Sequence, residues 1–154
     1  MSDNRIFFNS SPSPTIGVEL ELQILDKDTF KLVSGAPFIL NEFKDEPRIK
    51  EELLNSILEI NTNICKNTNE VRSDLKETLS KVLRFANKNG FELLSMGTHP
   101  FSRWNKQTIS SNPRYNNLIK RMQWPLRRLL ITGVHVHIGV DSGEKAIAVT
   151  NGLT

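Results

Sequence analysis

Several features that would narrow the function of this chain are scarce or missing. Cys65 is the only cysteine among the 154 residues, so no internal disulfide can form, and the chain suits a reducing compartment. No apolar run approaches the roughly 20 residues that cross a bilayer. The polar stretch at residues 1–14 lacks the apolar core of a signal peptide. We therefore expect a cytoplasmic protein without a membrane partner.

The chain also lacks the short motifs of two large enzyme classes. Neither the GxxxxGK[ST] phosphate loop nor the GxSxG nucleophile turn occurs. The net charge of +3 is too small to demand an acidic partner. The basic residues between positions 120 and 128 are more typical of a solvated helix face than of a nucleic-acid surface, so we expect no nucleic-acid partner.

What is present is an ordinary globular composition, 38% apolar and 24% charged, in a chain long enough for one domain. Residues 1–14 contain Ser-Ser-Pro-Ser-Pro, which interrupts helices and central strands, so we expect a flexible N-terminal tail. Residues 15–154 should form the folded part. Between positions 29 and 47, two prolines argue against any long element.

Apolar spacing predicts the main elements. Residues 15–25, TIGVELELQIL, alternate strictly between polar and apolar, as a strand with one buried face does. Residues 69–89 repeat apolar side chains at helical spacing and stop at Gly90. Further expected elements are strands at 57–62, 91–96 and 133–140, a loop at 97–104, a helix opened by Asn112-Pro113 and divided near Pro125, and a final helix capped by Asp141 or Ser142. Together they predict an α+β fold with a mainly antiparallel sheet and helices packed on one face.

Three glutamates are the first candidates for a functional site. Glu19 and Glu21 lie two residues apart on the polar face of the first strand, roughly 7 Å from each other by strand geometry. Two ionised carboxylates at that spacing repel, and Mg²⁺ or Mn²⁺ would relieve the repulsion. Glu59 lies between apolar neighbours and needs a partner for its charge. A solvent-exposed strand face and a simple ion pair are the alternatives.

Two histidines repeat this spacing on the last strand. In GVHVHIGV, His135 and His137 share one face, and the valines and isoleucine share the other. Imidazole is a common ligand of Zn²⁺ and Mn²⁺, although a pair of exposed or hydrogen-bonded histidines fits equally well. Three strands that each carry chelating groups on one face would form a platform for metal ions and phosphate.

Two further segments carry candidate binding residues. The loop GTHPFSRW holds His99 and Arg103, and Arg114 and Tyr115 follow at the start of the next helix. Arginine binds carboxylates and phosphates through two parallel hydrogen bonds. A surface arginine is the plain alternative for Arg114.

Taken in order, the segments TIGVELELQIL, LEINTNIC, GTHPFSRWNKQ, PRYNNL, GVHVHIGV, SGEKAI and NGL resemble the N-terminal part of the glutamate–cysteine ligase type 2 family, also called carboxylate–amine ligases. The resemblance runs from about Thr15 to Leu153. It implies that residues 15–154 are the N-terminal portion of a catalytic domain with a fold like that of glutamine synthetase. It also implies that ATP phosphorylates an amino-acid carboxylate and that an amine such as cysteine attacks the acyl phosphate.

The resemblance further implies roles for individual residues. Carboxylates at the positions of Glu19, Glu21 and Glu59 hold catalytic Mg²⁺ (or Mn²⁺), with His135 and His137 beside them. Arg114 and Tyr115 match a region near the substrates and are the expected catalytic residues, and His99 and Arg103 are the expected contacts of ATP.

Two other interpretations remain open at this stage. Family members are longer than this chain, so the missing strands would leave an open edge and an uncovered apolar face, which favour a homo-oligomer or a non-catalytic, self-associating fragment. The His-x-His pattern of His135 and His137 also occurs in metal-dependent hydrolases. In those enzymes, however, the pattern lies on an early strand, whereas here it lies near the end of the sequence.

Overall fold

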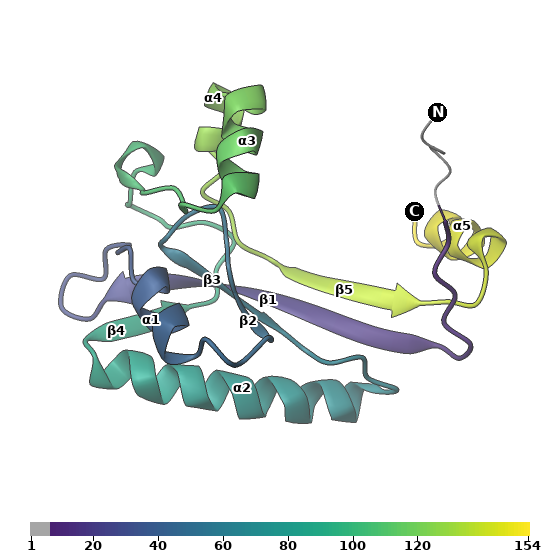
Figure 1. Ribbon diagram of the computed structural model, residues 1–154. Helices are drawn as coiled ribbons and strands as arrows, with labels where there is room; N and C mark the ends of the chain where they lie inside the picture. Colours follow the sequence, from purple (N-terminus) through teal and green to yellow (C-terminus); the bar gives the residue numbers. More distant parts are fainter. Residues whose placement is uncertain (1–6) are drawn as a thin grey trace.

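The computed structural model describes residues 7–154, and the expectations for residues 1–6 lie outside the described residues. Its centre is one long strand, β1 (Thr15–Asp26), around which a five-stranded antiparallel sheet forms (Figure 1). The other strands are β2 (Ile49–Glu51), β3 (Ile57–Asn61), β4 (Phe91–Leu94) and β5 (Val134–Gly139). The α+β class with a mainly antiparallel sheet is therefore confirmed.

Strand β1 is long enough to serve three neighbours. On one side it pairs with β3, which in turn pairs with β2. On the other side β5 pairs with residues 15–20 and β4 with residues 23–26. The two strands β4 and β5 therefore follow one another along the same edge of β1, and the chain between them leaves that edge and returns to it.

Two helices cover the apolar face of this sheet. The helix α2 (Thr68–Lys88) runs along the sheet, and α1 (Ala36–Glu42) packs beside it (Figure 1). The core between them includes Leu22, Ile24 and Leu58, which are buried almost completely. The side chain of Asn67 begins α2 by accepting hydrogen bonds from the N–H groups of residues 69 and 70.

The segment from 95 to 132 lies on the opposite, polar face. It contains a short 3₁₀ turn, Trp104–Lys106, and the helices α3 (Pro113–Met122) and α4 (Trp124–Arg127). The division expected near Pro125 occurs at Gln123, whose φ is 53°. A second, smaller apolar cluster, formed by Leu25, Leu54 and Leu130 among others, anchors this segment to the sheet.

The apolar face of β5 differs from expectation. The alternation predicted a face packed on helices, but Val134, Val136 and Ile138 are 57%, 60% and 51% exposed. In the described part of the chain no helix covers them, because α1 and α2 pack against β2, β3, β1 and β4. Within residues 7–154 the apolar face of β5 is therefore uncovered, and the final helix α5 (Gly143–Gly152) follows it along the chain. No helix within residues 7–154 is long and apolar enough to cross a membrane.

Candidate metal and substrate site

The strand register brings the predicted glutamates and histidines onto one face. Glu21 lies opposite Glu59 across β1 and β3, and Glu19 lies opposite His135 across β1 and β5. Residues directly opposite each other in an antiparallel pair point to the same side of the sheet. His137 lies two residues further along β5, on the same side as His135. The face predicted from alternation therefore exists as a continuous polar row.

At one end of this row, Glu19 joins both imidazoles. Its Oε2 lies 3.1 Å from Nδ1 of His135 and 3.2 Å from Nε2 of His137. Partial burial works to raise the pKa of Glu19, but the two imidazoles outweigh it, and the pKa falls below its usual value. The hydrogen bond to Glu19 in turn raises the pKa of His135. These three side chains can together offer oxygen and nitrogen ligands to a cation.

At the other end, three carboxylates converge. Glu21, Glu52 and Glu59 each place an oxygen within 4.8 Å of the others. The Glu59 side chain is only 12% exposed, and it accepts a hydrogen bond from Asn61 at 2.7 Å. Burial and the adjacent Glu59 carboxylate raise the pKa of Glu52 to about 7. Hard carboxylate oxygens gathered at this spacing suit Mg²⁺ or Mn²⁺, and the mutual repulsion would be relieved by such an ion.

Sequence reasoning missed Glu52. It follows β2 in the connection to β3, outside both strands, so no alternation marks it as a member of the polar face. Its carboxylate is held toward the cluster by the N–H of Leu53, which donates to Oε2 at 3.0 Å. The only signal in the sequence is the acidic pair Glu51-Glu52 directly before Leu53-Leu54, and acidic pairs are common on protein surfaces.

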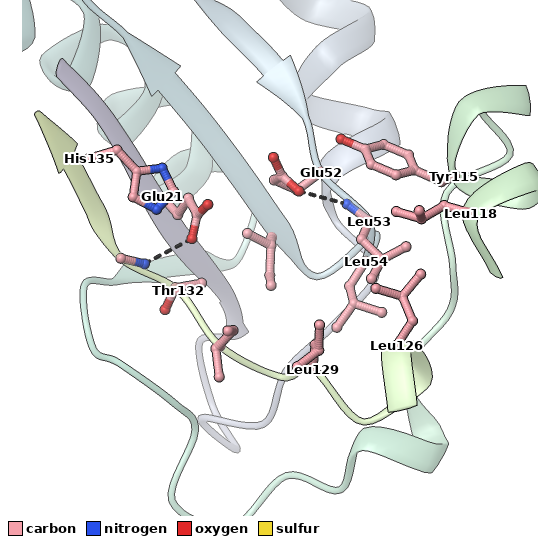
Figure 2. A pocket seen from close by; sticks show the side chains of 13 residues that line it. Glu21, Glu52, Leu53, Leu54, Tyr115, Leu118, Leu126, Leu129, Thr132 and His135 are labelled. Atoms are coloured by element: carbon pink, nitrogen blue, oxygen red, sulfur yellow. Dashed lines mark hydrogen bonds between the residues drawn. The ribbon is translucent and has the colours of Figure 1, made fainter. Parts of the chain in front are cut away.

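A cavity of about 330 Å³ opens beside the carboxylates. Figure 2 shows Glu21 and His135 on one wall, Glu52 near the middle, and Tyr115 with leucines of α3 and α4 on the opposite wall. The N–H of Gly133 donates to Oε2 of Glu21 at 2.8 Å and fixes that carboxylate at the cavity wall. The remaining wall is mainly apolar, with Leu53, Leu54, Ile57, Leu118, Leu126, Leu129 and Ile131. The cavity thus joins a charged end to an apolar end.

The two expected catalytic residues, Tyr115 and Arg114, lie in different environments. Tyr115 is buried in the cavity wall, where burial raises its pKa to about 12, and its hydroxyl donates to the carbonyl of Glu51 at 3.3 Å. Arg114 is exposed and lines an adjoining hollow of about 430 Å³ together with Lys50 and Tyr115. Arg114 therefore faces a neighbouring hollow rather than the carboxylate cluster.

His99 and Arg103 are not brought into the carboxylate cluster. They line a separate hollow formed by the loop after β4 and by residues 128–131. Both ring nitrogens of His99 are engaged by backbone groups, because Nδ1 accepts from the N–H of Ser102 at 3.0 Å and Nε2 lies 3.1 Å from the carbonyl oxygen of Phe30. The Arg103 side chain is exposed.

A sheet face of carboxylates and imidazoles beside a half-apolar cavity is the kind of site that holds divalent cations close to a small substrate. Comparison with known proteins narrows the class. Residues 15–154 match the sequence profile of glutamate–cysteine ligase family 2 (GCS2), and the chain belongs to this family.

Individual relatives agree with the family match. The chain is 43% identical over 152 residues to "Putative glutamate--cysteine ligase 2-1" of Mycolicibacterium smegmatis, which covers 99% of this chain and 40% of that protein. It is also 42% identical over 149 residues to "Putative glutamate--cysteine ligase 2" of Mycobacterium tuberculosis, a match that covers 97% of this chain and 40% of that protein. The chain therefore spans about 40% of the length of the curated relatives it matches.

Proposed function

We propose that this chain forms the metal-binding wall of an ATP-dependent carboxylate–amine ligase of the glutamate–cysteine type. The observation that carries the proposal is the polar face itself. Three carboxylates meet at one end of it, and a carboxylate with two imidazoles stands at the other end. Membership of glutamate–cysteine ligase family 2 supports the same reaction class.

In the proposed reaction, ATP transfers its terminal phosphoryl group to a carboxylate oxygen of an amino acid and leaves as ADP. The amine of the second substrate then attacks the carbonyl carbon of the acyl phosphate. The bond from that carbon to the phosphate oxygen breaks, the nitrogen releases one proton to solvent, and an amide and inorganic phosphate form. Divalent ions, when bound, supply positive charge to the phosphates during the transfer. Glu21, Glu52 and Glu59 would hold one ion, and Glu19 with the two imidazoles would hold another.

The cavity beside the carboxylates suits the second substrate. Its apolar wall fits a small, weakly polar side chain such as that of cysteine, while its charged end lies next to the proposed metal ions. Tyr115 closes one side of the cavity. Arg114, together with Lys50, offers positive charge from the adjoining hollow to a substrate carboxylate. We place the reaction in the cytoplasm, in keeping with the single cysteine.

Metal-dependent thermal stability tests the carboxylate cluster. Mg²⁺ or Mn²⁺ that binds only the folded chain should raise its melting temperature by several degrees, since saturating ligand at about 100 times Kd contributes about 2.7 kcal/mol. The double variant Glu19→Gln with Glu21→Gln should lose most of this rise. A matched control replaces the exposed Glu42 and Glu144 by glutamine and should retain it. Equal rises in all three proteins would rule out the proposed metal site.

A second candidate is a self-associating module. The exposed apolar side chains of β5 favour it, because a contiguous apolar strand face is a common contact surface between chains. Sedimentation over a concentration series would detect association, and Val136→Lys should abolish it. Ile147→Lys, at an exposed position of α5, is the control and should leave association unchanged. If the chain stays monomeric throughout, this candidate fails.

A further inference from the structure

The cavity beside the carboxylates offers more apolar space than a small side chain fills. Its volume is about 330 Å³, whereas an apolar cavity of about 150 Å³ in a protein core already holds benzene. Seven of its lining residues are leucine or isoleucine. Two of them, Leu129 and Ile131, are 42% and 59% exposed, so part of the apolar wall lies open to a ligand. An aliphatic or aromatic group that covers this wall would gain free energy by removing apolar surface from water.

The hydroxyl groups that line the cavity are already engaged. The hydroxyl of Tyr115 donates to the carbonyl of Glu51 at 3.3 Å. The hydroxyl of Thr132 donates to the carbonyl of Met96 and accepts a hydrogen bond from the side-chain amide of the buried Gln23 at 3.0 Å. A polar substituent that entered the apolar end would therefore lose its water without gaining a free hydroxyl proton in exchange. The apolar end favours a hydrocarbon group.

The charged end of the cavity favours a positive group. Among the described residues that line the cavity, Glu21 and Glu52 bring negative charge, and none is a lysine or arginine. His135 is the one lining residue that can gain positive charge near neutral pH, and its imidazole is paired with Glu19 at 3.1 Å. A ligand carboxylate placed at this end would therefore face two glutamates without a positive partner of its own, which is unfavourable.

A bound metal ion would leave this preference in place. Glu21, Glu52 and Glu59 together carry three negative charges when ionised, and a divalent ion neutralises two of them. One negative charge then remains, which a single ammonium group balances. An alkyl amine carries that charge near neutral pH, as the lysine side chain does.

We propose that the second substrate is a primary amine that has a branched aliphatic or aromatic body and no carboxylate beside the nitrogen. The ammonium group binds at Glu21 and Glu52, and the body packs against the leucines and isoleucines of the cavity. This proposal rests on the proposed function, because it narrows the amine of that reaction. Cysteine has a smaller side chain and carries a carboxylate, so it should bind this cavity less tightly than such an amine.

Matched ligands test the proposal by NMR on the 17.5 kDa chain. The N–H groups of Leu53 and Gly133 donate to Glu52 and Glu21, so their signals report binding at the cavity itself. Ethylamine, butylamine, 3-methylbutylamine and 2-phenylethylamine are added separately at pH 7 in EDTA. They carry the same charge and differ in the size of the body. Leucine and phenylalanine are the last two amines with a carboxylate added, and cysteine completes the set.

The affinities should rise with the apolar body. Each added methylene that becomes buried should tighten binding about fourfold, the equivalent of about 0.8 kcal/mol. Leucine should bind roughly tenfold more weakly than 3-methylbutylamine because of its carboxylate, and cysteine should bind more weakly still. An affinity that does not rise with the size of the body would overturn the proposal. So would leucine or cysteine that binds as tightly as 3-methylbutylamine.

Variants separate the apolar contact from the charge. Ile131→Ala and Leu129→Ala should each weaken binding of 3-methylbutylamine about fourfold and leave that of ethylamine nearly unchanged. Both side chains are exposed, so folding should stay intact. Ile64→Ala, at an isoleucine that is 82% exposed and lies outside the cavity, is the matched control and should bind as the wild type does. Glu52→Gln should weaken binding of every amine roughly tenfold. Equal affinities in the two isoleucine variants would contradict the proposed contact.

The outcome is separable from that of the metal site. Amine binding is measured in EDTA, and the thermal effect of Mg²⁺ is measured without amine. If Mg²⁺ stabilises the chain but the apolar amines do not bind, the amine proposal fails and the proposed function stands. If the apolar amines bind but Mg²⁺ has no effect, the proposed metal site fails and the preference of the cavity remains.

Discussion

Replacing Glu52 by glutamine should stabilise the metal-free chain at alkaline pH. The pKa of Glu52 rises from its usual 4.5 to about 7, because the carboxyl is partly buried and lies beside Glu59. Below about pH 4.5 the carboxyl is protonated in both the folded and the unfolded chain, so it does not lower the free energy of unfolding. As the pH rises from about 4.5 to about 7, the unfolded chain releases the proton while the folded chain still holds it, so the folded chain loses stability until the loss is complete above about pH 7.

The size of this loss follows from the shift in pKa. A rise from 4.5 to about 7 corresponds to about 3 kcal/mol. Since Glu52 is partly exposed to solvent, screening reduces the expected loss to about 1–2 kcal/mol. Glutamine has nearly the same shape and no charge, so Glu52→Gln should show no such loss.

Urea unfolding followed by circular dichroism measures this difference. In EDTA, wild type and Glu52→Gln should have similar free energies of unfolding near pH 5, and the variant should be more stable by about 1–2 kcal/mol near pH 8. Added Mg²⁺ should close the gap, because a bound cation relieves the same repulsion in the wild type. Glu42→Gln, at an exposed position on α1, controls for a general charge effect. If wild type and Glu52→Gln lose stability in parallel between these pH values, the carboxylate cluster does not carry the repulsion inferred for it.

Three other results are expected. Arg48 lowers the pKa of Glu46 to about 2, so Glu46→Gln should lower the free energy of unfolding by about 1 kcal/mol at neutral pH. Urea unfolding should show that this loss disappears as the pH falls from about 4.5 toward 2. A loss that persists in acid would contradict the ion pair. Leu58 is fully buried between the sheet and α2, and Leu58→Ala should lower the free energy of unfolding by about 3 kcal/mol, whereas a loss below 1 kcal/mol would contradict the packing. The hydrogen bond to Glu19 raises the pKa of His135, so in an NMR titration the imidazole should hold its proton to higher pH in the wild type than in Glu19→Gln, and identical titrations would exclude this contact.

The sequence was informative wherever a periodic pattern met a simple physical rule. Strict alternation predicted both faces of β1, and the strand register then had to place Glu19 and Glu21 on one side. The start of α2 at Asn67 and the break between α3 and α4 follow from capping and from proline chemistry. Such rules act within a few residues, so they can be applied without knowledge of the fold.

What the sequence did not reveal depends on contacts between distant segments. Helix α1 has only seven residues, and its Pro37 occupies the first turn, where a missing N–H does no harm. Glu52 reaches the carboxylate cluster from a connection between strands, and no spacing rule applies there. The alternation of β5 showed which face is apolar, but it could not show that α1 and α2 leave Val136 and its neighbours exposed.

The path of the chain between β4 and β5 has an evolutionary consequence. This segment starts and ends on the same edge of β1, so insertions or deletions within it need not shift the register of any strand. It also supplies walls to both the cavity beside the carboxylates and the separate hollow that His99 and Arg103 line. If the proposed ligase function holds, exchange of this one segment changes substrate preference while the strands that carry the carboxylates stay unchanged. A chimaera that transplants residues 95–132 between relatives is then a route to altered specificity.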